Sequence, residues 1–291
     1  ASGSVMSLVD GLGTSKVIPN DCCFSLLFCR CEVLTQAPEL PATTLTNACY
    51  EFMFQDCVNL TEAPKLPATK VYDKSYVGMF MGCRNLKIAP ELPATEMKYR
   101  CYDSMFRSCT SLETPPALPA KVLDRECYHQ MFQECTKLKE APELPATKMA
   151  TDCYSMMFTS CENLTVAPKL PATELAPACY YSMFSVCTNL TQAPELLATT
   201  LDSACYSGMF YLCSALEKAP DLPAKELTDN CYAYMFNGCT NLNYIKVGVM
   251  SLDNEFNATE TWVEGVDGPG TFVFPCGSQY DKHGASEVPP L

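Results

Sequence analysis

The chain is poor in the residue types that most catalytic and metal sites use. Its 291 residues include only two His, His129 and His283. Structural zinc sites commonly use C-x-x-C pairs, whereas this chain has only one close C-x-C spacing, at Cys29 and Cys31. Cys127 and His129 could be read as nucleophile and base, but Cys127 stands at a repeated core position and His129 at a variable one, which favours a structural role. We therefore expect no metal, no cofactor and no enzymatic activity.

Basic residues and long apolar runs are also scarce. Lys and Arg number 20 against 33 Asp and Glu, so the net charge is −13 and the pI is near 4.6. An acidic chain without a basic stripe does not follow a phosphate backbone, which argues against nucleic-acid binding. No apolar run approaches the roughly 18 residues of a membrane span. The chain begins Ala1-Ser2-Gly3-Ser4, and we expect both a removed signal peptide and a longer parent protein.

What the chain does have is a repeat without insertions or deletions. A strict period in this length range indicates units that each bury an apolar face against their neighbours. The sequence therefore predicts a solenoid of nine units. The repeating Phe residues, 26 positions apart, are Phe28, Phe54, Phe80, Phe106, Phe132, Phe158, Phe184, Phe210 and Phe236.

Each unit follows the pattern C-Y-x-x-M-F-x-x-C-x-x-L-x-x-A-P-x-L-P-A-T with few departures. In the second unit the apolar positions from Cys49 to Cys57 fall at i, i+1, i+4, i+5 and i+8, which favours one face of a short helix. The Pro-rich stretch after Leu60 is unsuited to a helix and predicts a short strand or extended segment. We expect an α/β repeat solenoid in which every unit is one short helix and one short strand.

The M-F-x-x-C-x-x-L core at this period resembles the BspA-like leucine-rich repeats of bacterial surface proteins, over about residues 22–242. The resemblance implies a right-handed leucine-rich-repeat superhelix that is exported, displayed at the cell surface and used to bind host or neighbouring-cell macromolecules. It implies no catalytic residues. The A-P-x-L-P-A-T stretch departs from the Leu- or Ile-rich strand that relatives commonly carry.

The 20 cysteines mostly occupy two repeat positions, five before and three after the Phe. Within one helical unit, Cys49 and Cys57 would lie about 12 Å apart, too far for a disulfide. Cysteines of adjacent turns could pair, for example Cys101 with Cys127, and metal binding is a further alternative. We favour buried free thiols, because Cys is among the most buried residue types.

The residue between Pro and Leu on the extended side varies and is mostly charged. Stacked side by side, each Lys in this column would lie between two Glu and relieve their repulsion. The column serves either solubility and register or the rim of an extended binding surface. Its charged members, our candidate binding residues, are Glu39, Lys65, Glu91, Glu143, Lys169, Glu195 and Asp221, with Ala117 between the first three and the rest.

The two ends of the chain break the period. Residues 1–21 are expected to form an N-terminal cap in which Val5, Met6, Leu8 and Val9 cover the first turn. Residues 243–291 are expected to form a small β-rich C-terminal cap and tail, with strands around Trp262-Val263 and around residues 272–274.

Two classes of function remain open. The first is a non-catalytic, monomeric recognition or adhesion module for a protein or glycan. Its competitor is a structural spacer that displays another domain, and a thiol-rich metal or redox buffer is a weaker third. Exposed aromatic residues gathered on one face would favour recognition. The candidates are Phe52, Tyr72, Tyr99, Tyr181, Tyr211 and Tyr234.

Overall fold

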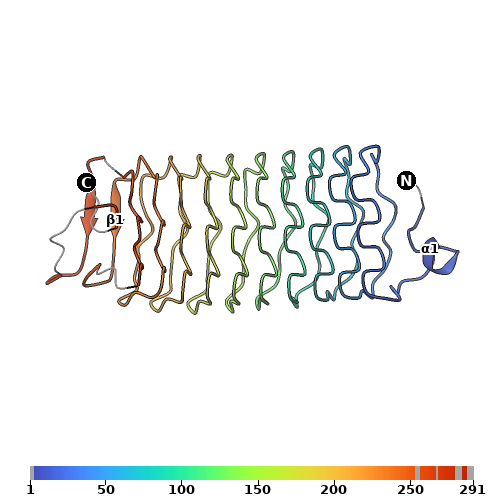
Figure 1. The fold of residues 1–291 in the computed structure, drawn as a ribbon, viewed down its shortest axis with the longest axis horizontal. Coiled ribbons are helices and arrows are strands. Elements are labelled where there is room, and N and C mark those ends of the chain that lie inside the picture. The colour runs from blue at the N-terminus through green and yellow to red at the C-terminus, as the bar shows by residue number, and fades with distance from the viewer. Residues whose placement is uncertain (1–2, 253–255, 267, 279–283, 287–291) are drawn as a thin grey trace.

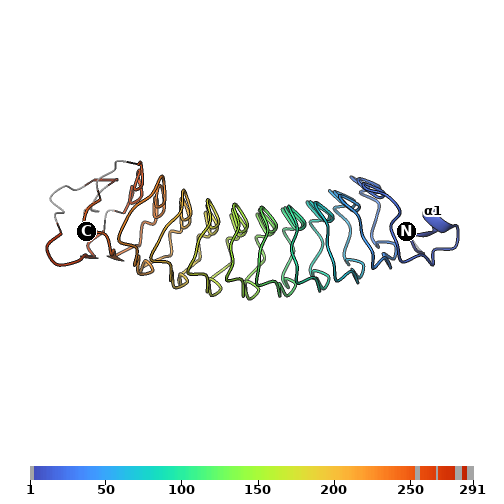
Figure 2. The ribbon, with the colours of Figure 1, turned by 90° about the horizontal axis from the view of Figure 1, so that it is seen from below.

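A computed structural model of the chain describes residues 3–252, 256–266, 268–278 and 284–286. The turns lie side by side in one elongated, gently bowed coil with the two termini at opposite ends (Figures 1 and 2). Parallel bridges join positions 26 residues apart, such as Gln36 with Glu62 and Glu140 with Val166. This register confirms the predicted 26-residue solenoid. His283 lies outside the described residues.

The prediction of one helix per unit is wrong. In the described part of the chain the only helix is the N-terminal α1 (Ser7–Asp10), and the only strands are β1 (Tyr244–Lys246) and β2 (Thr271–Val273). The segments expected to be helices are runs of consecutive tight turns, here called turn runs, each about ten residues long. In the fifth unit, Glu126, Gln130 and Glu134 have φ of 56°, 53° and 63°. A right-handed helix contains no such residue.

Two interleaved sets of hydrogen bonds define each turn run. In the fifth unit, the amides of Tyr128, Gln130 and Phe132 donate to carbonyls of the next unit at 2.9–3.0 Å. The amides between them donate three residues back within the run, as from Met131 to Tyr128 at 3.2 Å. Every second amide therefore binds the neighbouring turn, which an α-helix would prevent by using all its amides internally.

A strict period of four in the sequence explains this choice. Two inward residues alternate with two outward residues, so that Cys127-Tyr128, Met131-Phe132 and then Cys135 point inward. A helix turns by 40° too much over four residues and would rotate these residues away from a common face. The positive φ falls on the second outward residue, where Gly stands in three of the nine units, as at Gly78 and Gly238. The inter-turn bonds and the core offset the cost of positive φ at the non-Gly positions.

The extended segments are joined less regularly. Isolated parallel bridges lie eight and sixteen residues after the repeating Phe, as at Ile88–Thr114 and Val122–Lys148. Between these two positions lies the P-x-L-P stretch. No described backbone hydrogen bond joins the P-x-L-P stretches of two neighbouring units, and since Pro has no N–H the stretch cannot form a continuous ladder. The predicted strand is thus an extended segment with single bridges at its two ends.

The core consists of columns of identical side chains. Phe54, Phe80 and Phe106 are fully buried and stack in one column with ring centroids 5.6 and 5.7 Å apart, as predicted. A parallel column of Tyr begins at Phe24 and Tyr50, whose centroids are 5.8 Å apart. Aromatic side chains give large apolar areas to bury, and parallel offset rings are a favourable arrangement.

All 20 cysteines are free thiols, and fifteen are buried. From the second unit on, the Cys three residues after the repeating Phe has a defined bond: the Cys135 Sγ donates to the Phe106 carbonyl of the preceding unit at 3.1 Å. The same bond recurs in the neighbouring units, for example from Cys161 to Phe132. That carbonyl already accepts the Cys109 amide of its own unit, so the thiol satisfies its second lone pair. The cysteines therefore act as small buried donors between turns.

The C-terminal cap repeats the turn-run geometry once more. Residues 256–266 form a tenth run, with positive φ at Asn257, Thr261 and Gly265. Trp262 therefore lies in a turn run and not in the predicted strand; it is fully buried and packs on Phe236 at 6.0 Å between ring centroids. The second predicted strand is β2, which pairs in parallel with β1.

At the other end, the N-terminal cap differs in part from its prediction. Val5 and Met6 are buried and Ser4 bridges to Glu39, so the cap covers the extended side of the first turn. Leu8 and Val9, expected to cover this turn, lie in α1 and are 69% and 36% exposed.

Replacing a ring of the Phe column tests the core. Phe132→Ala removes a fully buried ring that stacks on Phe106 and Phe158 at 5.8 and 5.6 Å. We expect a loss of about 3–5 kcal/mol in unfolding free energy, measured by chemical denaturation. The exposed Glu91→Ala serves as the control and should unfold like the parent chain. An unchanged denaturation midpoint for the Phe132 variant would contradict the core assignment.

Alkaline pH tests the thiol columns. Burial raises the pKa of Cys101, Cys153 and Cys187 to about 12, against about 8.5 in an unfolded chain. Because the folded pKa is raised, the contribution of each thiol is complete below pH of about 8.5 and is lost by about 1.4 kcal/mol per pH unit above it.

We therefore expect the melting temperature, measured in reductant, to fall steeply between about pH 9 and 11. At neutral pH a thiol reagent should react quickly with only the two exposed and three half-buried cysteines, and with all 20 after denaturation. A flat melting profile, or rapid reaction of most thiols in the folded protein, would refute the burial of the columns.

Candidate functional site

The predicted charged column lies on the surface, at the centre of the extended side. Glu39, Lys65, Glu91, Glu143, Lys169, Glu195 and Asp221 are all exposed, and each is followed by a buried Leu. The expected pairing along the column does not occur among the described residues, where no salt bridge joins Lys65 or Lys169 to a neighbouring Glu. Asp221 alone forms an ion pair, with Lys246 of β1. The other charges of the column therefore remain available to a ligand.

Shallow grooves lie between neighbouring turns on this side, which we call the proline face. One groove of about 560 Å³ is lined by Pro38, Glu39, Pro64 and Lys65. Another of about 420 Å³ contains Pro116, Ala117, Pro142 and Glu143. Their position follows from the backbone, because the Pro residues interrupt the hydrogen-bonded ladder between turns. The sequence indicated the charges of this face but not the grooves beside them.

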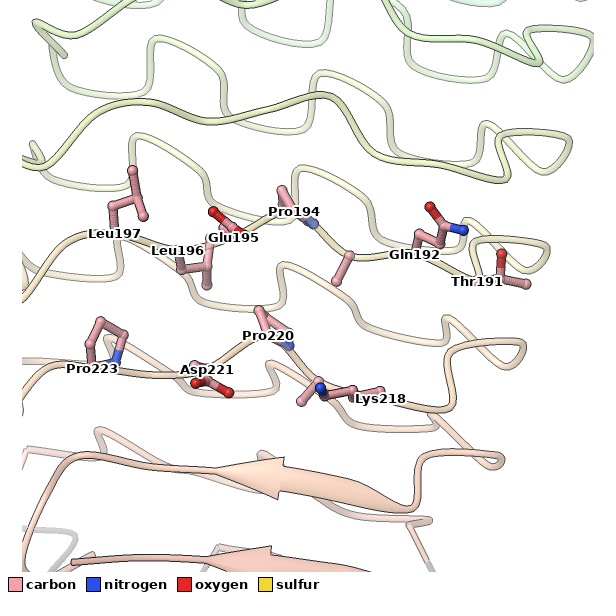
Figure 3. Close-up of a pocket in the computed structure, with 12 residues that line it drawn as sticks. Thr191, Gln192, Pro194, Glu195, Leu196, Leu197, Lys218, Pro220, Asp221 and Pro223 are labelled. Atoms are coloured by element: carbon pink, nitrogen blue, oxygen red, sulfur yellow. The ribbon is translucent and has the colours of Figure 1, made fainter.

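The largest of these grooves, about 710 Å³, lies near the C-terminal end. Figure 3 shows its two extended segments side by side, with Pro194 next to Pro220 and Glu195 next to Asp221. Leu197 stands where seven of the other eight units have Pro and is 46% exposed. Lys218 lies over the Tyr244 ring, 5.0 Å from its centroid. The groove thus combines apolar walls with carboxylates and a positioned ammonium group.

A further groove of about 520 Å³ lies beside the proline face, where the extended segment leads into the next turn run. Met97 and Leu123 form its apolar floor, and Lys98 and Lys121 are at its edges. Grooves of similar character therefore recur along much of the array, which is the arrangement expected for a ligand that spans several units.

The exposed aromatic residues do not gather on one face. The six candidates occupy five different repeat positions, and only Tyr72 and Tyr234 are exposed, at 39% and 40%. Tyr99 is covered by Arg125, whose guanidinium carbon lies 4.6 Å from the ring centroid. Phe52 packs over Gly78, where a Cβ would come within 2.3 Å of the ring. Tyr99 and Phe52 thus pack against neighbouring turns, and the scattered positions of the six residues define no single binding face.

A buried polar cluster in the middle of the array was not predicted. Asp103 is fully buried; its carboxylate accepts hydrogen bonds from Ser104 at 2.7 Å and from Arg100, and lies 3.3 Å from the Nδ1 atom of His129. Although burial alone raises the pKa of Asp103, hydrogen bonds from His129 and Ser104 and the Arg100 charge lower it overall. The carboxylate is therefore held in its ionised form.

Asp103, His129 and Ser155 occupy the same repeat position in three consecutive units, an order of residue types that resembles a hydrolytic triad. The structure joins only the first two. Ser155 is 2% exposed, and none of its described hydrogen bonds involves its hydroxyl. A nucleophile must reach both its base and a substrate, so this column acts as a structural ion-pair network. The sequence feature that could have indicated this cluster is an Asp and a His 26 residues apart, at a repeat position that faces the neighbouring turn.

The described ranges contain no group of three or more His, Cys, Asp or Glu side chains placed to hold a metal ion. They also contain no helix of the length and apolar character needed to cross a membrane.

Comparison with known proteins gives distant structural likenesses. No family model matches the chain, and no curated protein matches it. A leucine-rich cell surface protein from Faecalibacterium prausnitzii is 17% identical with a TM-score of 0.31, over 84% of this chain and 79% of that one. A leucine-rich repeat protein from Bacteroides ovatus is 16% identical with a TM-score of 0.26, over 86% of each chain. Both TM-scores are too low to support an argument about fold or function.

Removing the buried carboxylate tests the polar cluster. Asp103→Ala removes the acceptor of His129 and Ser104 and leaves Arg100 with Glu126, 3.3 Å away, as its remaining partner. We expect a loss of about 2 kcal/mol, since Arg100 is also one-third exposed. The folded pKa of Asp103 is lowered, so this contribution is present above pH of about 4 and disappears as pH falls through the folded value. The difference in melting temperature from the parent should therefore be full at pH 7 and shrink in acid.

The matched control is Asp221→Ala, which removes a half-exposed carboxylate that also has a basic partner. Its melting temperature should stay near that of the parent. Equal effects of the two substitutions would show that burial does not distinguish the Asp103 cluster.

Proposed function

We propose that the chain is a non-catalytic recognition module that binds an extended protein or glycan along the proline face. The observation that supports this most is the recurrence of grooves between neighbouring turns, with Pro walls and unpaired charged residues at the rim. A stiff array displays these grooves at a regular spacing, as solenoid binding surfaces commonly do. Since each groove is shallow, affinity would be spread over several units.

The chemistry of the grooves defines the ligand. Prolines and Leu197 offer apolar contacts, while Glu39, Glu143 and Glu195 offer acceptors. An extended chain with donor groups at regular intervals, basic in a peptide or hydroxylated in a glycan, would match both features. The net charge of −13 agrees with a basic or neutral ligand better than with an acidic one.

The setting of this activity belongs to the same proposal. The repeat resembles BspA-like surface proteins, and we propose that the chain is exported, displayed at a cell surface and monomeric, with a right-handed leucine-rich-repeat superhelix. The host or a neighbouring cell would present the ligand.

Two alternative functions compete with recognition. As a spacer, the array would hold another domain away from the cell and its grooves would have no ligand. As a thiol buffer, it would need accessible thiolates, but fifteen of its thiols are buried and burial raises the pKa of those in the columns, such as Cys101 and Cys153. Reactive cysteines are found in partly exposed, electropositive surroundings, so this third alternative has the least support.

A binding screen with matched variants tests the proposal. The intact chain is screened against immobilised matrix proteins and a glycan array. The variant Leu197→Glu changes the wall of the largest groove at a residue that is 46% exposed, and binding to a hit should weaken about tenfold or more. The control Leu212→Glu makes the same change at a 39% exposed Leu on the turn-run side and should leave binding unchanged.

A deletion distinguishes recognition from spacing. Removing residues 99–150, two whole units, joins equivalent positions and keeps the repeat in phase. The shortened array should fold, as judged by the emission of the buried Trp262, and bind the hit more weakly because it has fewer grooves. Undiminished binding by both the deletion and Leu197→Glu would place the site elsewhere and favour a spacer.

A further inference from the structure

The two ends of the turn-run ladder differ in how they are closed. At the C-terminal end, residues 284–286 cover the last run: the Val263 amide donates to the Ala285 carbonyl at 3.0 Å, and the Thr261 amide donates to the Ser286 Oγ at 2.9 Å. At the N-terminal end, the cap lies on the extended side, where Ser4 bridges to Glu39 and Val17 to Thr44. In the described chain nothing covers the first turn run.

The uncovered edge consists of backbone acceptors. In later units the carbonyls at the equivalent positions accept amides of the preceding turn, as Cys49 accepts from Phe24 at 2.9 Å. In the first run, no described hydrogen bond reaches the carbonyls of residues 21, 23, 25, 27 and 29. The ladder is directional, since its inter-turn donors all point toward the C-terminus. Its N-terminal edge is therefore a row of acceptors without a donor.

The side chains at this edge are also uncovered. Leu27 is 41% exposed, whereas Met53 at the same repeat position in the second unit is fully buried. Cys31 is half-buried although the equivalent Cys57 is fully buried. Cys57 donates its thiol hydrogen to the Phe28 carbonyl of the preceding turn, whereas among the described residues no turn run precedes Cys31. An apolar core face and a row of acceptors thus coincide.

We propose that this edge is a docking site for one further turn run of the same repeat, entering from the N-terminal side of Gly3. In every unit the turn run precedes its extended segment. Residues 3–18 already supply the extended half of a preceding turn, with Val5, Met6 and Ile18 buried. A turn run is the half that these residues do not supply, and one placed before Gly3 would complete the turn. Its alternate amides would face the five free carbonyls.

A second copy of the chain does not fit this edge. Two N-terminal edges would place acceptors against acceptors, and the C-terminal donor edge of another copy is covered by residues 284–286. The partner must instead present a row of amides at every second residue together with an apolar face. The turn run of this repeat has both properties.

An extended chain tests the proposal. Residues 47–63 are copied and placed directly before Gly3, in place of residues 1 and 2, so that Gly3 follows as Pro64 does in the second unit and Ser4 takes the position of Lys65. Accessible thiols are modified for short times and mapped by mass spectrometry. Docking should bury Cys23 and Cys31 and slow their modification by about tenfold or more, because modification then requires local opening. The exposed Cys276 at the other end should react at an unchanged rate.

Two control extensions isolate the cause. One carries Phe54→Asp in the copied segment, which removes the ring that would stack on Phe28. The other has a single Gly inserted before Gly3, which shifts the register. Both should leave Cys23 and Cys31 as reactive as in the parent chain. The added segment lies outside the nine existing units, so these stay folded in all variants, with Trp262 buried as the check. Equal reactivity of Cys31 in the parent and the in-register extension would overturn the proposal.

Discussion

The structure depends on the hydrogen bond that every second amide of a turn run donates to the next turn. This ladder sets the distance between turns, and the Phe and Tyr rings stack at 5.5–6.1 Å along it. Each repeating Phe carbonyl has a second lone pair free, and this lone pair accepts a hydrogen bond from the thiol of the next unit, as the Phe80 carbonyl does from Cys109. The other amides donate three residues back within the run, and every fourth residue of the run has a positive φ. Ring columns, thiol columns and backbone strain are therefore consequences of one bonding pattern.

The sequence predicts the parts of this fold that rest on burial. The 26-residue period correctly places Phe54, Phe80 and Phe106 in one column and the repeated cysteines inside. It fails on the backbone, because inward residues at i, i+4 and i+8 drift by only about 40° per step on a helix, so within one unit they resemble a helical stripe although a run of turns aligns them better. The deciding bonds lie between units and are not visible in the pattern of one unit. The local signal that favours turns is Gly at the positive-φ position, as at Gly78, Gly208 and Gly238.

The candidate site shows the same division. The charged column that contains Glu39 and Lys65 is visible in the sequence and lies at the surface. The grooves beside it arise where Pro interrupts the ladder between turns, which is a tertiary effect. The Asp103 cluster was not predicted for a related reason: Asp103 and His129 are 26 residues apart in sequence and become neighbours only when the turns stack. Ladder and grooves are complementary: the turn-run side is rigidly bonded, while the proline face leaves room for a ligand.

The repeated segments are ladders of turns and not helices. Backbone couplings measured by NMR at Glu126, Gln130 and Glu134 distinguish the two structures, because these couplings report the sign of φ. The turn run requires positive φ at all three residues, with negative φ between them. Negative φ throughout residues 126–134 would restore the helix and contradict the ladder on which the fold depends.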